Sequence, residues 1–170
     1  NFNTDLAERL LDSSELLSED TAPFGREHSI EVQLPFLQHL WEDRFSLVPI
    51  CLKDQSEDVA VEVSKALERN VPPGTLVVSS TDFTHYESQE DAEKKDKLAI
   101  ESIMNRNFDE FYKRVRKHHI SICGYGSIGV LIDFALKKDL SPTRLKYATS
   151  GEVSGYGREV VGYGAIGFRK

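Results

Sequence analysis

An aspartate and a histidine three residues apart, Asp82 and His85, have types and spacing suited to proton transfer. They follow the apolar run 75–78, which is typical of a short buried strand. In an open α/β sheet, ligands bind just beyond the carboxyl ends of strands, and a carboxylate placed there can orient an imidazole. The same residues also fit a plainer interpretation, a loop with an Asx turn at Asp82 and a partly exposed His85.

A second candidate is Cys123, which lies among glycines just before the apolar helical run 128–136. A cysteine at a helix amino terminus is favoured as thiolate, the form that attacks electrophiles and binds metals. The alternative is a packed cysteine beside glycines that allow close backbone approach. The sequence alone leaves both interpretations open.

A third candidate is His28, three residues before Glu31 in the apolar segment 27–41. Residues at this spacing share one face of a helix, so the pair is either part of a site or a salt-bridged cap. The second interpretation is the safer one from these residues alone.

Apolar periodicity predicts the elements that position these candidates. Ser and Asn residues that can cap helices, and turn residues such as Pro35, set the expected limits. Residues 144–149 and 160–168 are expected to pair as an antiparallel hairpin joined by the Gly/Ser-rich loop 150–157. The whole is predicted to be one three-layer α/β/α domain over residues 1–170 with a mixed sheet. The expected strands are 45–52, 75–80, 143–149 and 159–168, and the expected helices are 4–11, 27–41 with a kink or late start at Pro35, 56–68, 88–105, 108–119 and 128–136.

Composition excludes several classes of partner. The 170 residues have 39% hydrophobic content, enough for a single core, and a formal net charge of −7. That charge argues against nucleic acid and anionic membranes as partners, and no apolar stretch approaches the ~20 residues of a membrane helix. Two distant cysteines, Cys51 and Cys123, make no disulfide framework, so a reducing, cytoplasmic location is expected. The chain begins with Asn1 rather than Met, so the lack of a leader pattern proves little.

Several stretches together resemble the Memo family, named for a mediator of receptor-driven cell motility. They are EHSIEVQLPFL (27–37), VVSSTDFTHY (77–86), SICGYGSIGVLI (121–132) and the ending YATSGEVSGYGREVVGYGAIGF (147–168). Memo-like proteins are similar in fold to class III extradiol dioxygenases, which open catechol rings with non-haem iron. The resemblance implies an α/β sandwich with a pocket at the strand ends, and it places His28, Asp82, His85 and Cys123 at pocket positions.

The resemblance also implies a metal, attributed in Memo relatives to two histidines of the amino-terminal half and the cysteine matching Cys123. The motifs carrying those histidines are absent, so the chain is expected to be the carboxy-terminal part of a Memo-like domain. A separate chain or segment would supply the rest. With two imidazoles, the Cys123 thiolate would suit iron or copper, and zinc less well.

Three functional hypotheses remain. In the first, a metal-dependent, dioxygenase-like oxidoreductase acts on a small molecule, with His85 positioned by Asp82 as acid/base and His28 contacting substrate or holding the pocket shape. In the second, a vestigial pocket binds a peptide or partner protein, since animal Memo members are described as signalling scaffolds and microbial relatives are associated with a radical-SAM protein. In the third, Cys123 is a hydrolytic nucleophile with His85 as base.

Overall fold

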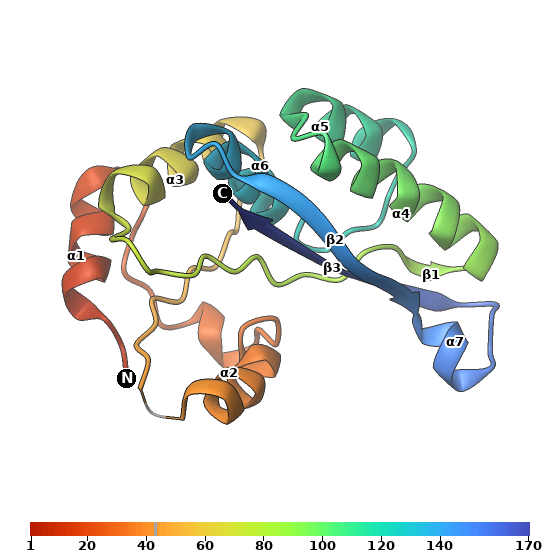
Figure 1. Ribbon diagram of the computed structural model, residues 1–170, viewed down its shortest axis with the longest axis horizontal. Coiled ribbons are helices and arrows are strands. Elements are labelled where there is room, and N and C mark those ends of the chain that lie inside the picture. The colour runs from red at the N-terminus through yellow and green to blue at the C-terminus, as the bar shows by residue number, and fades with distance from the viewer. Residues whose placement is uncertain (43) are drawn as a thin grey trace.

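The computed structural model describes residues 1–42 and 44–170. Helices account for most of the regular structure, and three strands form a small sheet near the carboxyl end (Figure 1). The helices are α1 (Thr4–Ser13), α2 (Leu34–Trp41), α3 (Glu57–Asn70), α4 (Gln89–Met104), α5 (Phe108–Lys117), α6 (Tyr125–Lys137) and α7 (Ser150–Ser154), with 3-10 turns at Pro23–Gly25 and Glu31–Gln33.

The helix starts lie where the capping residues predict them. The side chain of Asn3 accepts a hydrogen bond from the backbone N–H of Leu6, and that of Ser88 accepts one from Asp91. These bonds satisfy backbone donors that the first turn of a helix otherwise leaves without a partner. In the segment 27–41, α2 starts only at Leu34, with Pro35 in its first turn, so the late start predicted from that proline is confirmed.

The sheet has the order β1-β3-β2, and both pairings are antiparallel. Strands β2 (Ser141–Thr149) and β3 (Val160–Arg169) form the predicted hairpin, and β1 (His85–Glu87) pairs with the start of β3. The connection between β2 and β3 contains α7, where the sequence predicted only a loop; at its start, the backbone N–H of Thr149 donates to Glu152 Oε1 at 3.0 Å. The α/β class is confirmed, but the described sheet is purely antiparallel rather than mixed.

The predictions of strands at 45–52 and 75–80 are wrong for the described residues. Both segments run extended but join no ladder; the first makes only an isolated bridge, between Leu47 and Phe2. Figure 1 shows both as unpaired traces that cross the middle of the molecule. A strand needs a hydrogen-bonded neighbour, which its own apolar composition cannot supply.

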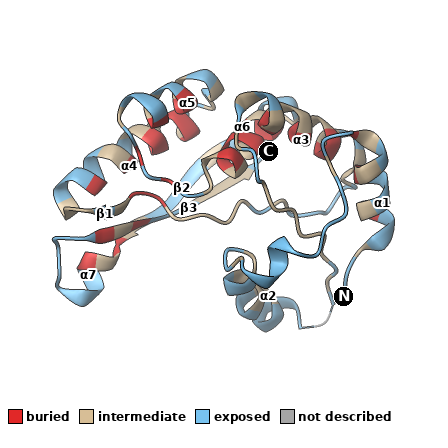
Figure 2. Ribbon diagram, turned by 180° about the vertical axis from the view of Figure 1, so that it is seen from behind, coloured by how far each residue is buried: buried red, intermediate tan, exposed pale blue. Residues whose placement is uncertain are grey.

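The core lies among α3 to α6 and the sheet. Phe111 of α5, Ile132 of α6 and Val160 of β3 are fully buried, and Figure 2 shows buried positions on these helices and at the start of β3. In contrast, α2 has no buried residue, although its sequence LPFLQHLW is largely apolar. Within the described part of the chain, we find no helix with the length and apolar character needed to cross a membrane.

Candidate functional site

The imidazole of His85 is anchored by a residue far away in the sequence, Ser121. The backbone N–H of His85 donates to Ser121 Oγ at 2.8 Å, and ring Nδ1 lies 3.0 Å from the Ser121 carbonyl oxygen. A carbonyl oxygen only accepts hydrogen bonds, so Nδ1 carries a hydrogen. In the neutral ring, Nε2 therefore holds the free lone pair and is the atom able to take a proton.

Asp82 faces this second nitrogen rather than the anchored one. Its Oδ2 lies 3.5 Å from His85 Nε2, beyond the length of a strong hydrogen bond. A carboxylate opposite a nitrogen lone pair gains an ion pair only after that nitrogen has accepted a proton. The arrangement brings the predicted Asp82–His85 pair together, with the backbone of Ser121 as the main orienting group and Asp82 as a counter-charge for the protonated ring.

Cys123 occupies the position predicted for it, immediately before the amino terminus of α6, whose N-cap is Gly124. The thiol is exposed. Its Sγ lies 3.3 Å from Thr81 Oγ1 and 3.9 Å from the carbonyl oxygen of Asp82. The thiol therefore adjoins the segment that carries Asp82. Within the described part of the chain, neither hydrogen bond of Sγ involves the His85 ring, whereas the hydrolytic hypothesis would need that contact.

Two further side chains brace the turn at Cys123, and sequence reasoning did not single them out. Thr81 Oγ1 accepts a hydrogen bond from Gly124 N–H at 2.7 Å. Gln55 accepts one from Gly126 N–H at 2.8 Å and donates one to the Cys123 carbonyl oxygen at 2.9 Å. These bonds cover backbone groups at a helix end that would otherwise lack partners. Their partners are 43 to 71 residues away in sequence, so no local pattern could have revealed them.

His28 makes a local contact. Its Nδ1 lies 3.3 Å from Glu31 Oε2, and both side chains are largely exposed. This is the salt-bridged pair that their spacing predicts. The neighbouring residue Ser29 reaches towards the site, because its carbonyl oxygen accepts a hydrogen bond from Ser80 Oγ at 2.6 Å. The structure thus ties the His28 segment to the chain just before Asp82 and pairs the His28 ring with Glu31.

A tyrosine of β3, Tyr163, also belongs to this neighbourhood. Although Tyr163 is 46% exposed, its partial burial and the negative charge of Asp82 raise the pKa of its phenol, so the hydroxyl stays protonated at neutral pH and can donate a hydrogen bond. Beside His85, the exposed ring of Tyr86 has its centroid 5.7 Å from the imidazole centroid. The only signal for Tyr163 in the sequence is an aromatic residue between glycines, which is too weak to assign a role.

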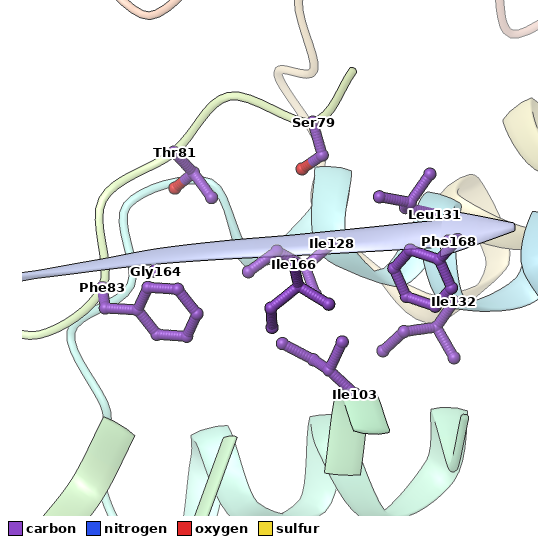
Figure 3. Close-up of a pocket in the computed structure, with 10 residues that line it drawn as sticks. All are labelled: Ser79, Thr81, Phe83, Ile103, Ile128, Leu131, Ile132, Gly164, Ile166 and Phe168. Carbon is purple, nitrogen blue, oxygen red and sulfur yellow. The ribbon is translucent and has the colours of Figure 1, made fainter. Parts of the chain in front are cut away.

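A small, open, mostly apolar cavity of about 60 Å³ adjoins the polar groups (Figure 3). Ser79 and Thr81 lie along one side, and Ile166 and Phe168 of β3 line the other. Ile103 of α4 closes it from the helical side. Because Thr81 borders both the cavity and the Cys123 thiol, the cavity opens next to the cluster of Asp82, His85 and Cys123.

The described residues do not by themselves form a metal centre. Within 1–42 and 44–170, no group of three or more His, Cys, Asp or Glu side chains is placed to hold a metal ion. Cys123 offers one soft ligand, and transition-metal sites in proteins use three or four. A metal at this position would need ligands beyond those that this part of the chain supplies.

Comparisons with known proteins agree on one family. The sequence profile of the family described as "Memo-like protein" matches residues 1–167. The chain is 46% identical over 167 residues to a "MEMO1 family protein" of Thermotoga neapolitana, covering 95% of this chain and 57% of that protein. It is 38% identical over 165 residues to a MEMO1 family protein of Thermoplasma acidophilum (97% and 61%) and 44% over 144 residues to one of Methanosarcina mazei (82% and 54%). The chain therefore spans little more than half the length of these relatives.

Proposed function

Because the chain belongs to the Memo-like protein family, we propose that it carries the acid–base side of a metal-dependent, dioxygenase-like redox site. The observation that supports this proposal is the convergence of Asp82, His85 and Cys123, whose contacts all pass through the short segment 81–85. The site acts on a small organic molecule that lies partly in the adjoining apolar cavity.

The proton-transfer role falls to His85. With Nδ1–H held by the Ser121 carbonyl oxygen, Nε2 accepts a proton from a substrate hydroxyl, and Asp82 stabilises the resulting imidazolium. Tyr163 stays protonated and donates a hydrogen bond to the substrate oxygen that has lost its proton.

The metal, iron or copper in preference to zinc, would take Cys123 as one ligand, and its remaining ligands would come from the part of the family domain that this chain does not contain. His28, whose neighbour Ser29 is bonded to Ser80, would hold the shape of the pocket or contact substrate. On this proposal, the complete domain is a three-layer α/β/α sandwich of the class III extradiol dioxygenase type, located in the cytoplasm.

Metal content tests the proposal. We would measure iron and copper by elemental analysis after anaerobic loading of this chain, alone and combined with the part of the Thermotoga neapolitana relative that lies outside the match. About one metal per chain is expected only in the combined sample. Cys123→Ser should abolish it, whereas Cys51→Ser, which removes the other free cysteine, should leave it unchanged.

Equal metal content in the combined wild-type and Cys123→Ser samples would exclude Cys123 as a ligand. No metal in the combined sample under reducing conditions would remove the metalloenzyme proposal altogether.

A second candidate function is a non-catalytic module that binds a peptide or partner protein through the same pocket. The exposure of Asp82, Tyr86 and Cys123, and the lack of a ligand cluster among the described residues, favour it. Substituting His28 or Asp82 would then weaken partner binding, and no turnover would be detectable in the wild-type protein or in the variants. Turnover that depends on His85 would argue for the enzyme instead.

A further inference from the structure

The segment that carries His85 is held by hydrogen bonds of its backbone. Phe83 N–H donates to the Gly162 carbonyl oxygen, and Gly162 N–H donates to that of Thr84, both at 2.9 Å. On the other side, His85 N–H donates to Ser121 Oγ at 2.8 Å. Between these contacts lies the N–H of Thr84, whose partner is neither β3 nor Ser121.

The partner of this N–H group is the carboxyl group of Asp96, on α4. Thr84 N–H donates to Asp96 Oδ1 at 2.9 Å, and both residues are completely buried. Figure 1 shows α4 alongside β1 and β3, which brings this carboxyl group to the segment that leads into β1. A buried N–H without an acceptor is costly, so the backbone at Thr84 stays where its acceptor lies.

The carboxyl group of Asp96 is itself held in one position. Its second oxygen, Oδ2, accepts a hydrogen bond from the Tyr147 hydroxyl of β2 at 2.8 Å. The same oxygen lies so close to Gly162 that a Cβ at that position would overlap it. The glycine thus leaves the room that the carboxyl group occupies. Because both oxygens are bonded and the surroundings are closely packed, Asp96 offers Thr84 N–H an acceptor in a fixed place.

Holding Thr84 also holds His85, because one planar peptide unit joins the two residues. The His85 ring keeps its lone pair on Nε2 only while Nδ1 meets the Ser121 carbonyl oxygen, which lies 3.0 Å away. That contact depends on distance and angle, so a shift of the backbone at 84–85 weakens it. In the described chain the hydrogen bonds of Asp96 go to Thr84 and Tyr147, so its influence on the ring passes through the backbone.

We propose that Asp96 is a positioning residue of the candidate site, whose carboxyl group fixes the Thr84–His85 backbone so that His85 presents Nε2, and not Nδ1, as its proton acceptor. The inference rests on the acid–base role proposed for His85 above. The arrangement itself needs neither metal nor substrate. Removing the carboxyl group therefore changes which ring nitrogen carries the hydrogen, and this change is measurable without turnover.

The tautomer of the neutral His85 ring provides the test. Nitrogen-15 NMR of the histidine-labelled chain distinguishes a ring nitrogen that carries a hydrogen from one that does not. Spectra are recorded with a chelator at about pH 8, above the ordinary pKa of histidine. Among the five histidines, the His85 signals are those missing in His85→Gln. The Nδ1–H form should predominate in wild type, and its population should fall at least twofold in Asp96→Ala, because Thr84 N–H loses its acceptor.

Further variants separate positioning from a general loss of stability. Asp96→Asn keeps an oxygen for Thr84 N–H and should retain the wild-type tautomer. Ile100→Ala removes a side chain that is also buried, one turn further along α4, and should lower stability but leave the tautomer unchanged. Urea unfolding measures the stability of each variant. If Asp96→Ala does not fold, Asp96→Ser replaces it, since the serine hydroxyl lies one bond closer to the backbone than the carboxyl oxygens do.

Four results would overturn the inference. They are a wild-type ring in the Nε2–H form, a tautomer unchanged by alanine or serine at position 96, a fall in Asp96→Asn as large as that in Asp96→Ala, and an equal fall in Ile100→Ala. The redox proposal is judged separately by metal content. A combined sample without metal would remove that proposal and leave the tautomer series intact, whereas unchanged tautomers in a metal-binding sample would remove only the role of Asp96.

Discussion

Two regions of this chain have similar apolar sequence but opposite burial. Around α4 to α6 and β3, apolar side chains such as Phe111 and Val160 are completely covered. Around α2 and the extended segment 75–80, Phe36, Leu76 and Val78 are more than half exposed. The first region finds its partners within the described chain, and the second does not.

The difference shows that a local pattern can fix a helix, but that the burial of the helix and the pairing of a strand depend on distant residues. The helix α2 forms where its sequence predicts it, with Pro35 in the first turn, because its hydrogen bonds are internal. The segment 75–80 cannot form a strand alone, because every bond of a strand goes to another strand. Substitutions in the two regions should therefore have very different energetic effects.

The largest contrast is expected between two phenylalanines. Phe111→Ala removes a fully buried ring and should lower the free energy of unfolding by about 3 to 5 kcal/mol. Phe36→Ala removes a ring that is already mostly hydrated and should change that free energy by less than about 0.5 kcal/mol. Urea unfolding of both variants measures the contrast. Equal costs would show that α2 is packed in solution and that the two regions do not differ.

A smaller contrast is expected between two glycines. A Cβ on Gly162 of β3 would overlap Asp96 Oδ2, the atom that accepts a hydrogen bond from Tyr147. Gly162→Ala should therefore cost about 1 to 3 kcal/mol, because the carboxyl group must move away from its donor. At Gly25, nothing lies within 4 Å of an added Cβ, so Gly25→Ala should be nearly neutral.

Thermal unfolding of the two alanine variants provides the measurement. A Gly162→Ala protein as stable as the Gly25→Ala protein would mean that the sheet yields easily around Asp96. The close approach of Gly162 to Asp96 would then not constrain the residue at position 162.

Local signals predicted much of the fold. Asn3 and Ser88 cap the helices that they were expected to cap, and the hairpin of β2 and β3 follows from two β-rich runs around a Gly-containing connection. The strands expected at 45–52 and 75–80 failed, since pairing depends on residues elsewhere. A mixed sheet was inferred from those two strands, so that prediction failed with them.

The contacts of the candidate site also fall into those that local sequence predicts and those that it does not. The contacts of Asp82 with His85, and of His28 with Glu31, are three residues apart and could be predicted from spacing. The groups that hold the site in place could not. Ser121 anchors His85 across 36 residues, and Thr81 contacts Cys123 across 42. Only the fold brings these residues together.

The subtlest expected effect concerns pH and the buried carboxyl group of Asp96, which joins α4 to the sheet. It accepts hydrogen bonds from Thr84 N–H at 2.9 Å and from the Tyr147 hydroxyl at 2.8 Å. Burial raises the pKa of this carboxyl above its ordinary value, although both bonds oppose the rise. The folded protein therefore holds this proton at a pH where the unfolded chain has lost it.

The sign of the effect follows from this difference in proton binding. The ordinary pKa of an aspartate is about 4. As pH rises from there through the raised pKa of Asp96, this residue loses its proton in the unfolded chain before it does so in the folded protein. Deprotonation stabilises the unfolded chain, so the free energy of unfolding decreases. Asp96→Asn keeps a side-chain oxygen that can accept the hydrogen bond from Thr84 N–H and an amide group that can bond to the Tyr147 hydroxyl. The asparagine side chain does not titrate in this pH range. Its stability relative to wild type should therefore increase as pH rises from about 4 to 7.

Tyr147→Phe sharpens this measurement, which compares urea unfolding of each variant with wild type across that pH range. Removing the phenol takes away one of the two bonds that favour the carboxylate, so the pKa of Asp96 rises further. The loss of stability with increasing pH should then be steeper than in wild type. A difference between Asp96→Asn and wild type that stays constant with pH would show that the carboxyl group titrates alike in both states. The interior around α4 would then be as open to water as the surface around α2.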